Sequence, residues 1–259
     1  MLTPPVSDTS DLTVRLDGAV AVITGGASGI GLAIADLYAS FGAQVMIVDR
    51  DQEAAAEAAV RIGRRTRSYG CDVTSSASVQ ETVQAIMTAA GQVDVLVNSA
   101  GVALLGPAAE LSDEHWDATL AVNLTGTYLM CREVGARMLE RGLGGKIINL
   151  ASQAATVALA DHVAYCASKS GVVGMTRVLA LEWGGRGVTV NTISPTVALT
   201  PLGISAWDNP KGRAHMAEIP VGRFATPEEI AATAAFLASG AADMINGADL
   251  MVDGGYTIR

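Results

Sequence analysis

Short apolar runs rich in β-branched residues alternate along the chain with longer stretches in which apolar residues recur at helical spacing. The runs lie at 19–24, 44–48, 93–97, 146–150 and 188–193, with a last short one at 250–252. Unbroken apolar stretches such as 95–97 and 147–148 are typical of strands that are buried on both faces. The pattern predicts βαβ crossovers and therefore an α/β fold: a single-domain, Rossmann-type, doubly wound parallel sheet with helices on both faces.

The N-terminus and one internal segment depart from this pattern. Residues 1–16 contain prolines and several Asp, Ser and Thr but no apolar core flanked by basic residues, which excludes a signal peptide and predicts a flexible N-terminal arm. Residues 194–222 contain four prolines, which break any long element, and we expect a mobile lid there. No repeat or linker divides the remainder, so 17–259 are expected to form a single domain.

Beyond the lid, the sequence indicates where a helix begins. Thr226 is a typical N-cap residue, Pro227 suits the first turn, and Glu229 stands at the third helical position. An alanine-rich stretch follows these residues. We therefore expect a helix here, before the last short strand.

Composition narrows the possible partners and the location. Half of the 259 residues are hydrophobic and 17% are charged, below the roughly 25% of an average soluble chain, which suggests that partner subunits cover part of the surface. The net charge of −9 repels phosphate backbones and anionic headgroups, so nucleic acid and membranes are not expected partners. Cys71, Cys131 and Cys166 match neither a disulfide framework nor a zinc spacing. Reduced thiols in a cytoplasmic protein without a metal site are the simplest interpretation.

A glycine-rich turn follows the first strand. Gly25, Gly29 and Gly31 stand between that strand and an apolar helix. Such a turn lets the backbone approach a pyrophosphate, whose charge the free amides and the helix dipole stabilise. The spacing Gly-x-x-x-Gly-x-Gly differs from the Gly-x-Gly-x-x-Gly fingerprint, and the alternative is a tight turn that glycine merely permits. Because the strand, the helix and an acidic partner are all present, we interpret the turn as a nucleotide cradle.

The acidic partner is Asp49, at the end of the second strand. A carboxylate there accepts both hydroxyls of an adenosine ribose and repels the 2′-phosphate of NADP, so NAD is the favoured cofactor. Arg50 softens that repulsion, and a solvated Asp–Arg pair is the alternative. Asp72 and the run 98–101 (Asn-Ser-Ala-Gly) also follow strands, where ligands bind in open parallel sheets, although each alone is compatible with a turn.

Three residues suggest proton chemistry. Tyr165 and Lys169 stand four residues apart on a predicted helix, which brings the phenol and the ammonium to one face. A nearby positive charge stabilises a phenolate and lowers the pKa of tyrosine toward neutrality. The phenolate can then take an alcohol proton while Ser152, just beyond a strand, holds the reacting oxygen. The alternatives are a half-buried helix tyrosine and a solvated lysine.

The glycine-rich turn, the run at 98–101, Ser152 and the Tyr165–Lys169 pair occur in the same order as in the short-chain dehydrogenase/reductase family, and the chain resembles that family over residues 20–256. The family's catalytic tetrad falls on Asn123, Ser152, Tyr165 and Lys169. The resemblance implies that the asparagine holds a water against the lysine, and that the chain forms a homotetramer in which the tyrosine-bearing helix packs against its copy. The expected cofactor-binding residues are Gly25, Ser28, Gly29, Ile30, Asp49, Arg50, Asp72, Val73, Asn98, Ala100, Gly101, Tyr165, Lys169, Ala198 and Thr200.

Two departures from the family pattern refine the resemblance. Ser99 replaces a usual asparagine, and Thr196 follows Pro195 where many members have glycine; threonine resists a positive φ. The segment that follows resembles the sugar- and polyol-converting branch of the family. The residues that this implies at the substrate are Ser152, Gln153, His162 and Trp207. There are structural alternatives for three of them. The glutamine side chain could bond to the backbone, the histidine could cap the helix, and the tryptophan could pack within the lid.

The combined expectation is NAD-dependent oxidation of a secondary hydroxyl of a short-chain polyol, with tyrosinate as the general base. A tetritol such as threitol or a pentitol such as xylitol would give the ketose. A 3-oxoacyl thioester reductase is one alternative, but its acidic carrier needs a basic surface and the net charge is −9. A non-catalytic nucleotide-binding sensor is another, for which an intact tetrad has no use.

Overall fold

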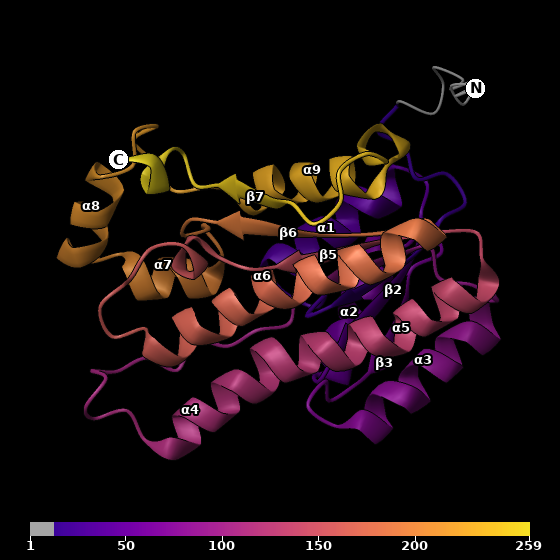
Figure 1. The fold of residues 1–259 in the computed structure, drawn as a ribbon, viewed down its shortest axis with the longest axis horizontal. Coiled ribbons are helices and arrows are strands. Elements are labelled where there is room, and N and C mark those ends of the chain that lie inside the picture. The colour runs from indigo at the N-terminus through magenta and orange to yellow at the C-terminus, as the bar shows by residue number, and fades with distance from the viewer. Residues whose placement is uncertain (1–12) are drawn as a thin grey trace.

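The computed structural model describes residues 13–259, which form a parallel sheet of seven strands (Figure 1). The strands are β1 (Val20–Thr24), β2 (Gln44–Asp49), β3 (Arg67–Gly70), β4 (Val95–Asn98), β5 (Gly145–Leu150), β6 (Val188–Pro195) and β7 (Asp249–Val252). Their order across the sheet is β3-β2-β1-β4-β5-β6-β7, and every pair is parallel. The connections change direction between β1 and β4, and this switch point is where such sheets bind ligands.

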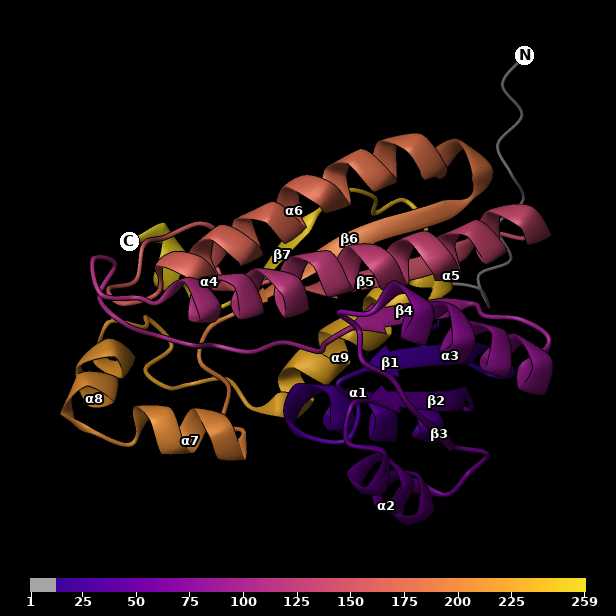
Figure 2. The ribbon, with the colours of Figure 1, turned by 90° about the horizontal axis from the view of Figure 1, so that it is seen from below.

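Helices cover both faces of the sheet (Figure 2). They are α1 (Gly29–Ser40), α2 (Gln52–Ile62), α3 (Ser76–Ala90), α4 (Asp113–Leu120), α5 (Thr127–Arg141), α6 (Val163–Trp183), α7 (Pro201–Trp207), α8 (Pro210–Ala217) and α9 (Pro227–Ala238). α1, α2 and α9 pack on one face, and α3, α5 and α6 pack on the other. None of the helices between residues 13 and 259 has both the length and the apolar character that crossing a bilayer requires.

The central strands are buried on both sides, as the unbroken apolar runs predict. In β1, Ala21 and Ile23 face the core beneath α1 and α9, whereas Val20 and Val22 face the core beneath α3 and α5. All four are at most 3% exposed. The alternation follows from the two-residue period of a strand. The expected fold class, a single doubly wound α/β domain with a parallel sheet, is confirmed.

The edge of the sheet is less apparent in the sequence. β3 reads Arg-Ser-Tyr-Gly and is not an apolar run, because an edge strand pairs on one side and is half-exposed. Most of the expected N-terminal arm lies outside the described residues. Within its last part, Leu16 is buried in the core, and its amide donates to the carbonyl of Phe41 at 3.0 Å.

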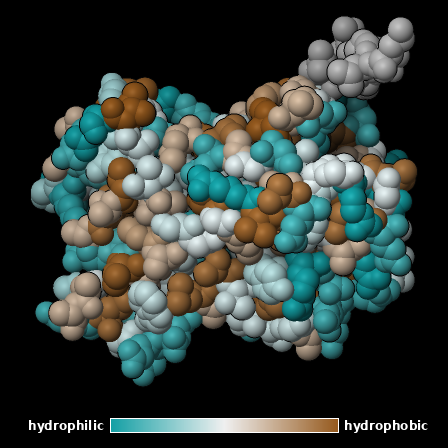
Figure 3. All heavy atoms as spheres, in the orientation of Figure 1, coloured by the Kyte–Doolittle hydropathy of each residue, from teal (hydrophilic) through white to brown (hydrophobic). Residues whose placement is uncertain are grey.

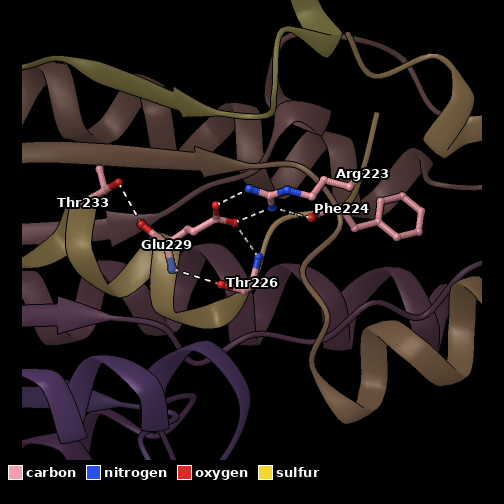
Figure 4. Close-up of polar contacts among 5 residues, drawn as sticks. All are labelled: Arg223, Phe224, Thr226, Glu229 and Thr233. Atoms are coloured by element: carbon pink, nitrogen blue, oxygen red, sulfur yellow. Dashed lines mark hydrogen bonds and ion pairs between the residues drawn. The ribbon is translucent and has the colours of Figure 1, made fainter. Parts of the chain in front are cut away.

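The expected lid, residues 194–222, begins within β6, whose last residues are Ser194 and Pro195, so that only the chain beyond Pro195 leaves the sheet; this part contains the short helices α7 and α8. Pro201 and Pro210 stand at the starts of these helices, where the missing amide hydrogen costs nothing. The helix expected after the lid is α9, and its capping box is present (Figure 4). The hydroxyl of Thr226 accepts from the amide of Glu229 at 3.3 Å, and the Glu229 carboxylate accepts from the amide of Thr226 at 2.9 Å. Arg223 also pairs with Glu229, at 2.5 Å, so the residue that follows the lid is held against the start of α9.

Candidate active site

The cradle between β1 and α1 depends on its glycines. Gly25 and Gly29 have φ angles of +65° and +54°. A Cβ on Gly25 would lie 2.8 Å from the Cα of Ala100, and one on Gly31 would lie 2.2 Å from the carbonyl oxygen of Gly25. Ser28 is the N-cap of α1, and its side chain does not cap the helix. The first turn of α1 has no acidic side chain, so its amides and dipole are available to a phosphate.

The polar residues expected beside the adenosine lie around this cradle. Asp49 is half-buried at the end of β2, and its carboxylate accepts from the amide of Ala27, in the cradle, at 3.2 Å. The carboxylate is therefore fixed beside the glycine-rich turn. Arg50 is exposed next to it. Hydrogen bonds from Thr74, and then the charge of Arg50, lower the pKa of Asp72, which keeps that carboxyl ionised.

Residues 98–101, at the end of β4 and just after it, connect the cradle to Lys169. The hydroxyl oxygen of Thr24 accepts from the amides of Ser99 and Ala100, at 3.1 and 3.2 Å. These bonds hold the loop after β4 against the end of β1. A Cβ on Gly101 would lie 3.7 Å from Nζ of Lys169. The serine at position 99 thus preserves a bend that leads from the dinucleotide cradle to the lysine.

Asn98 has a different environment from its neighbours. Its side-chain amide donates to Oδ1 of Asn149 at 2.8 Å and to Sγ of Cys131 at 3.2 Å, all within the core. Asn149 in turn donates to the hydroxyl of Thr176 at 2.9 Å. Burial raises the pKa of Cys131 to about 12, so this thiol stays protonated. The side chain of Asn98 serves this core network, and any contact from this residue to a cofactor comes from its main chain.

Four further residues of the expected cofactor set flank the cradle. Ile30 is half-buried in the first turn of α1, and Val73 is buried just beyond β3. Ala198 is buried in the lid. A Cβ on Gly29 would lie 3.3 Å from the methyl group of Thr200, whose hydroxyl caps α7. The start of the lid therefore lies against the glycine-rich turn.

Tyr165 and Lys169 lie on one face of α6, at its N-terminal end. The Lys169 ammonium lies over the Tyr165 ring, 5.7 Å from its centroid. Lys169 is 6% exposed, and its Nζ donates to the carbonyl oxygen of Leu150 at 2.6 Å. The end of β5 therefore fixes the lysine at the base of the tyrosine.

The pKa of Tyr165 differs from the sequence-based expectation. Burial raises it, and the hydrogen bond with Ser152 lowers it by less. The polypeptide alone therefore does not bring this pKa toward neutrality, because burial of the phenol outweighs its hydrogen bond. That the lysine charge and an oxidised nicotinamide together lower the pKa stays a prediction for the cofactor-bound enzyme. Burial lowers the pKa of Lys169 to about 8.

Asn123 lies in a π-helical turn, Ala121–Gly126, that joins α4 to α5. Its side chain accepts from the amide of Val102 at 2.8 Å and donates to the carbonyl of Val102 at 2.9 Å. It also donates to the hydroxyl of Ser168, on α6, at 3.1 Å. The widened turn lets a fully buried asparagine tie the loop after β4 to the helix that carries the tyrosine and the lysine.

Ser152 and Gln153 follow β5 and face the lid. Ser152 is hydrogen-bonded to Tyr165, and its hydroxyl oxygen accepts from the amide of Ala154 at 3.1 Å. Gln153 is 2% exposed, and its Nε2 lies 3.1 Å from Nε2 of His215, on α8. The alternative of a backbone bond for the Gln153 side chain is thus not what is observed. Sequence reasoning missed His215, because a histidine inside a proline-broken segment gives no local sign of the partner it meets.

His162 and Trp207 connect the catalytic tyrosine to the lid. His162 is at the N-cap position of α6, but its side chain does not cap the helix and its Nδ1 lies 2.6 Å from the carbonyl of Ala160. Its ring lies 6.1 Å from the Tyr165 ring and 6.4 Å from the Trp207 ring. Trp207 continues to His215, at 4.9 Å between centroids. All four residues expected at the substrate therefore lie together with His215.

These residues fit a nicotinamide dinucleotide. The glycines let the turn pack closely against neighbouring backbone where a Cβ would collide, the first amides of α1 can bind a pyrophosphate, and Asp49 can bind a ribose. At the other end of the same edge, Ser152 and Tyr165 can bind and deprotonate a hydroxyl. Among residues 13–259, no group of His, Cys, Asp and Glu could hold a metal ion.

Comparison with known proteins gives the family. Residues 25–257 match the family model described as enoyl-(acyl carrier protein) reductase. A D-threitol dehydrogenase of Mycolicibacterium smegmatis is 62% identical over 252 residues, which cover 96% of each chain. An NAD-dependent glycerol dehydrogenase of Listeria innocua is 47% identical over 96% of this chain and 98% of that protein. The structure of a short-chain type dehydrogenase/reductase from Mycobacterium marinum matches with a TM-score of 0.91 and 31% identity, over 97% of this chain and 100% of that one. The chain belongs to the short-chain dehydrogenases/reductases.

As a short-chain dehydrogenase/reductase, the chain is an oxidoreductase that acts on CH–OH groups with a nicotinamide dinucleotide. The expected tetrad residues lie around the N-terminal half of α6. Tyr165 and Lys169 are on the helix, Ser152 meets the tyrosine, and Asn123 holds the next turn through Ser168. The geometry accounts for a hydroxyl site at one end of the dinucleotide cradle.

Proposed function

We propose that this protein oxidises a secondary hydroxyl of a short-chain polyol, a tetritol or a pentitol, to the ketose with NAD. The observation that carries the proposal is the contact of Tyr165 with Ser152 and Lys169, beside polar Gln153 and His162 rather than an apolar pocket. A polyol presents further hydroxyls next to the reacting one, and these need polar partners. The 62% identity to a D-threitol dehydrogenase supports a four-carbon substrate.

The tetrad residues divide the chemistry between them. Ser152 donates a hydrogen bond to the reacting oxygen, and Tyr165 as tyrosinate takes the hydroxyl proton. A bound NAD would supply the acceptor for the hydride of the carbinol carbon, and the positive charge of its oxidised ring would favour the phenolate. Lys169 adds its charge at the ring face. Because burial raises the pKa of Tyr165, we expect initial rates in the oxidation direction to rise with pH.

The choice of NAD over NADP rests on Asp49. Its carboxylate is held beside the glycine-rich turn by the amide of Ala27, and a carboxylate there would repel the 2′-phosphate of NADP. We expect Asp49→Ser to raise kcat/KM with NADP relative to NAD by about 100-fold, because it removes a repulsion between like charges. Arg50→Ala is the matched control, and it should shift the ratio toward NAD. An unchanged ratio in Asp49→Ser would reject this basis for cofactor choice.

The rival activity is reduction of a 3-oxoacyl thioester, and the description of the matching family model as a reductase of carrier-protein substrates favours testing it. An acidic carrier requires free basic residues, and the basic residues of α5 are engaged. Arg137 pairs with Glu133 and Glu140, and Arg132 donates to Ser76. These contacts, with the net charge of −9, disfavour carrier docking.

A substrate panel distinguishes polyol oxidation from thioester reduction and from a non-catalytic sensor. Initial rates should be measured with threitol, erythritol, xylitol and arabinitol, each with NAD and with NADP, and with acetoacetyl thioester and NADH or NADPH in reverse. We expect the highest kcat/KM for an alditol with NAD. Preferential reduction of the thioester would replace the proposal by the rival. Binding of NAD without turnover of any compound would instead favour a sensor.

We also propose that the protein is a cytoplasmic homotetramer. An exposed stripe on α6, poor in large polar side chains, supports the assembly: Val163 is 40% exposed, Val178 53% and Leu181 84%. Hydrophobic residues lie among polar ones on the face that α4, α5 and α6 form (Figure 3). The three cysteines are unpaired, which agrees with a reducing compartment. Leu181→Glu should dissociate the assembly in light scattering after gel filtration, and an unchanged mass would contradict packing through α6.

A further inference from the structure

Six residues form a circuit that joins the catalytic residues to the lid; side-chain contacts make five of its links, and the sixth is the peptide bond between Ser152 and Gln153. The circuit consists of Ser152, Gln153, His215, Trp207, His162 and Tyr165. Its members come from the end of β5, from α6 and from both helices of the lid. On one side it contains the hydroxyls that meet the reacting oxygen. On the opposite side lies a buried pair, the Gln153 amide and the His215 imidazole.

This pair leaves one polar atom unsatisfied. Gln153 is 98% buried, by its 2% exposure, and its Oε1 has no hydrogen-bond partner among the described residues, while Nε2 meets His215. A buried amide oxygen without a partner is costly and rare in folded proteins. The side-chain amide of Gln153 has an oxygen and a nitrogen. Whichever of the two atoms meets the imidazole, the other is free. A hydroxyl can satisfy either end, because it both donates and accepts.

His215 is held so that it can orient this amide. His215 is 8% exposed, and the centroid of its ring lies 4.9 Å from that of Trp207 and 4.4 Å from that of Tyr256. Burial lowers its pKa, against the charge of Glu218, so the imidazole is neutral near pH 7 and has one nitrogen that accepts and one that donates. Glu218 is itself paired with Arg259 at the C-terminus. The lid and the C-terminal segment therefore fix the imidazole from both sides.

We infer that His215 is a positioning residue for substrate specificity: it orients the Gln153 amide so that its free end binds a substrate hydroxyl remote from the reacting carbon. The inference rests on the proposed polyol oxidation and identifies what selects a polyol over a simple alcohol. A substrate that lacks the remote hydroxyl leaves the amide end unpaired, and such an unpaired buried group is what gives hydrogen-bonding sites their discrimination. His215 contacts the substrate only through Gln153 in this account.

The test compares two four-carbon substrates, threitol and butane-2,3-diol, which lacks the terminal hydroxyls. In His215→Leu, we expect the ratio of kcat/KM for threitol to that for butane-2,3-diol to fall about tenfold or more, mainly through KM for threitol. The KM for NAD and kcat for butane-2,3-diol should change by less than about twofold. His215→Gln, whose amide can still pair with Gln153, should restore most of the ratio.

Lys211→Ala is the matched control on the same helix. Lys211 pairs with Asp161 at 3.1 Å on the surface, so its removal loosens α8 without touching Gln153. We expect it to leave the substrate ratio unchanged. An equal loss for both substrates in His215→Leu, or the same change of ratio in Lys211→Ala, would overturn the inference in favour of a lid that merely needs packing.

A second measurement tests the contact apart from turnover. In a double-mutant cycle of Gln153→Leu and His215→Leu, followed by chemical denaturation, the two changes should be non-additive, because each alone leaves a buried polar partner. Additive changes would overturn the pairing of these residues whatever the substrate. If the wild-type enzyme oxidises no alditol but the cycle is non-additive, the proposed function fails while the pairing stands.

Discussion

The cradle and the lid lie at the same edge of the sheet and are held in different ways. Around the cradle, main-chain groups make the contacts: Gly25 lies against the main chain of Ala100, and the amides of that loop donate to the hydroxyl of Thr24. In the lid, side chains meet side chains, as Trp207 and His215 do. The cradle tolerates few substitutions, and its residues form short motifs that can be recognised in the sequence. The lid depends on contacts between distant residues, and no short motif recorded the partner that His215 meets.

This difference teaches where cofactor and substrate specificity reside. A dinucleotide is bound by backbone amides and a few glycines, so the same cradle suits every member of a family. A substrate is chosen by side chains that distant segments bring together, such as Gln153 and His215. Changes in the cradle should affect all substrates alike, and changes in the lid should affect them unequally.

The largest effect is expected at the junction of the two regions, in Tyr165→Phe. Loss of the general base should lower kcat by about 10²- to 10⁴-fold for every substrate. The affinity for NAD should stay within about twofold, because the glycines and Asp49 are untouched. Steady-state rates and a fluorescence titration with NADH measure the two quantities. Near-normal turnover would remove the tyrosine from the mechanism.

A smaller effect is expected from Gly25→Ala, within the cradle. A Cβ would lie 2.8 Å from the Cα of Ala100 at a φ of +65°, so the loop must move. The KM for NAD should rise about tenfold or more with every alditol, alongside a lower Tm. Gly91→Ala is the control, because Gly91 has a φ of +78° with nothing within 4 Å and lies far from the site. Gly91→Ala should lower Tm and leave KM for NAD unchanged. An equal rise of KM for NAD in both variants would contradict a role of the cradle in binding NAD.

In the lid, Trp207→Ala should act on the substrate and not on the cofactor. Trp207 contacts both His162 and His215 and closes the circuit between them. We expect kcat/KM for an alditol to fall about tenfold, with KM for NAD unchanged. Rates at saturating NAD with varied threitol, and the converse, separate the two constants. A main effect on NAD would show that the two regions are not distinct.

The smallest change is one of stability, in Lys169→Met. The ordinary pKa of 10.5 falls to about 8 in the folded protein, so the buried ammonium is unfavourable. Below pH 8 the folded state carries the whole penalty, and above pH 10.5 both states are neutral and the penalty is gone. The variant should therefore be more stable than the wild type by about 1–3 kcal/mol below pH 8, with the difference vanishing toward pH 10.5.

Denaturation curves at pH 7 and pH 10 measure this difference. The activity of Lys169→Met should be lost at both values, which separates its stability from its role in turnover. A variant less stable than the wild type at pH 7 would mean that the bond from Lys169 to Leu150 outweighs the desolvation of the ammonium.

The sequence indicated the tetrad better than it indicated the environment of the tetrad. The spacing from Tyr165 to Lys169 fixes a shared helix face, and this contact is present. In the polypeptide alone the pKa of the tyrosine is raised, which the spacing did not indicate, because the sequence carries no measure of how deeply the phenol is buried. The capping box at Thr226 was predicted residue by residue, since it depends only on neighbours in sequence. The edge strand β3 was not, since its polarity follows from its place in the sheet.

The sequence by itself determined the alternation of strands and helices, the glycine-rich turn, the helical pair of tyrosine and lysine, and the start of α9. Each of these depends on residues within one or two turns of each other, where spacing fixes geometry. Only the tertiary structure decided that Gln153 meets His215, 62 residues away, and that Asn98 turns into the core. Contacts between distant segments depend on how the elements pack, and no local pattern records that packing.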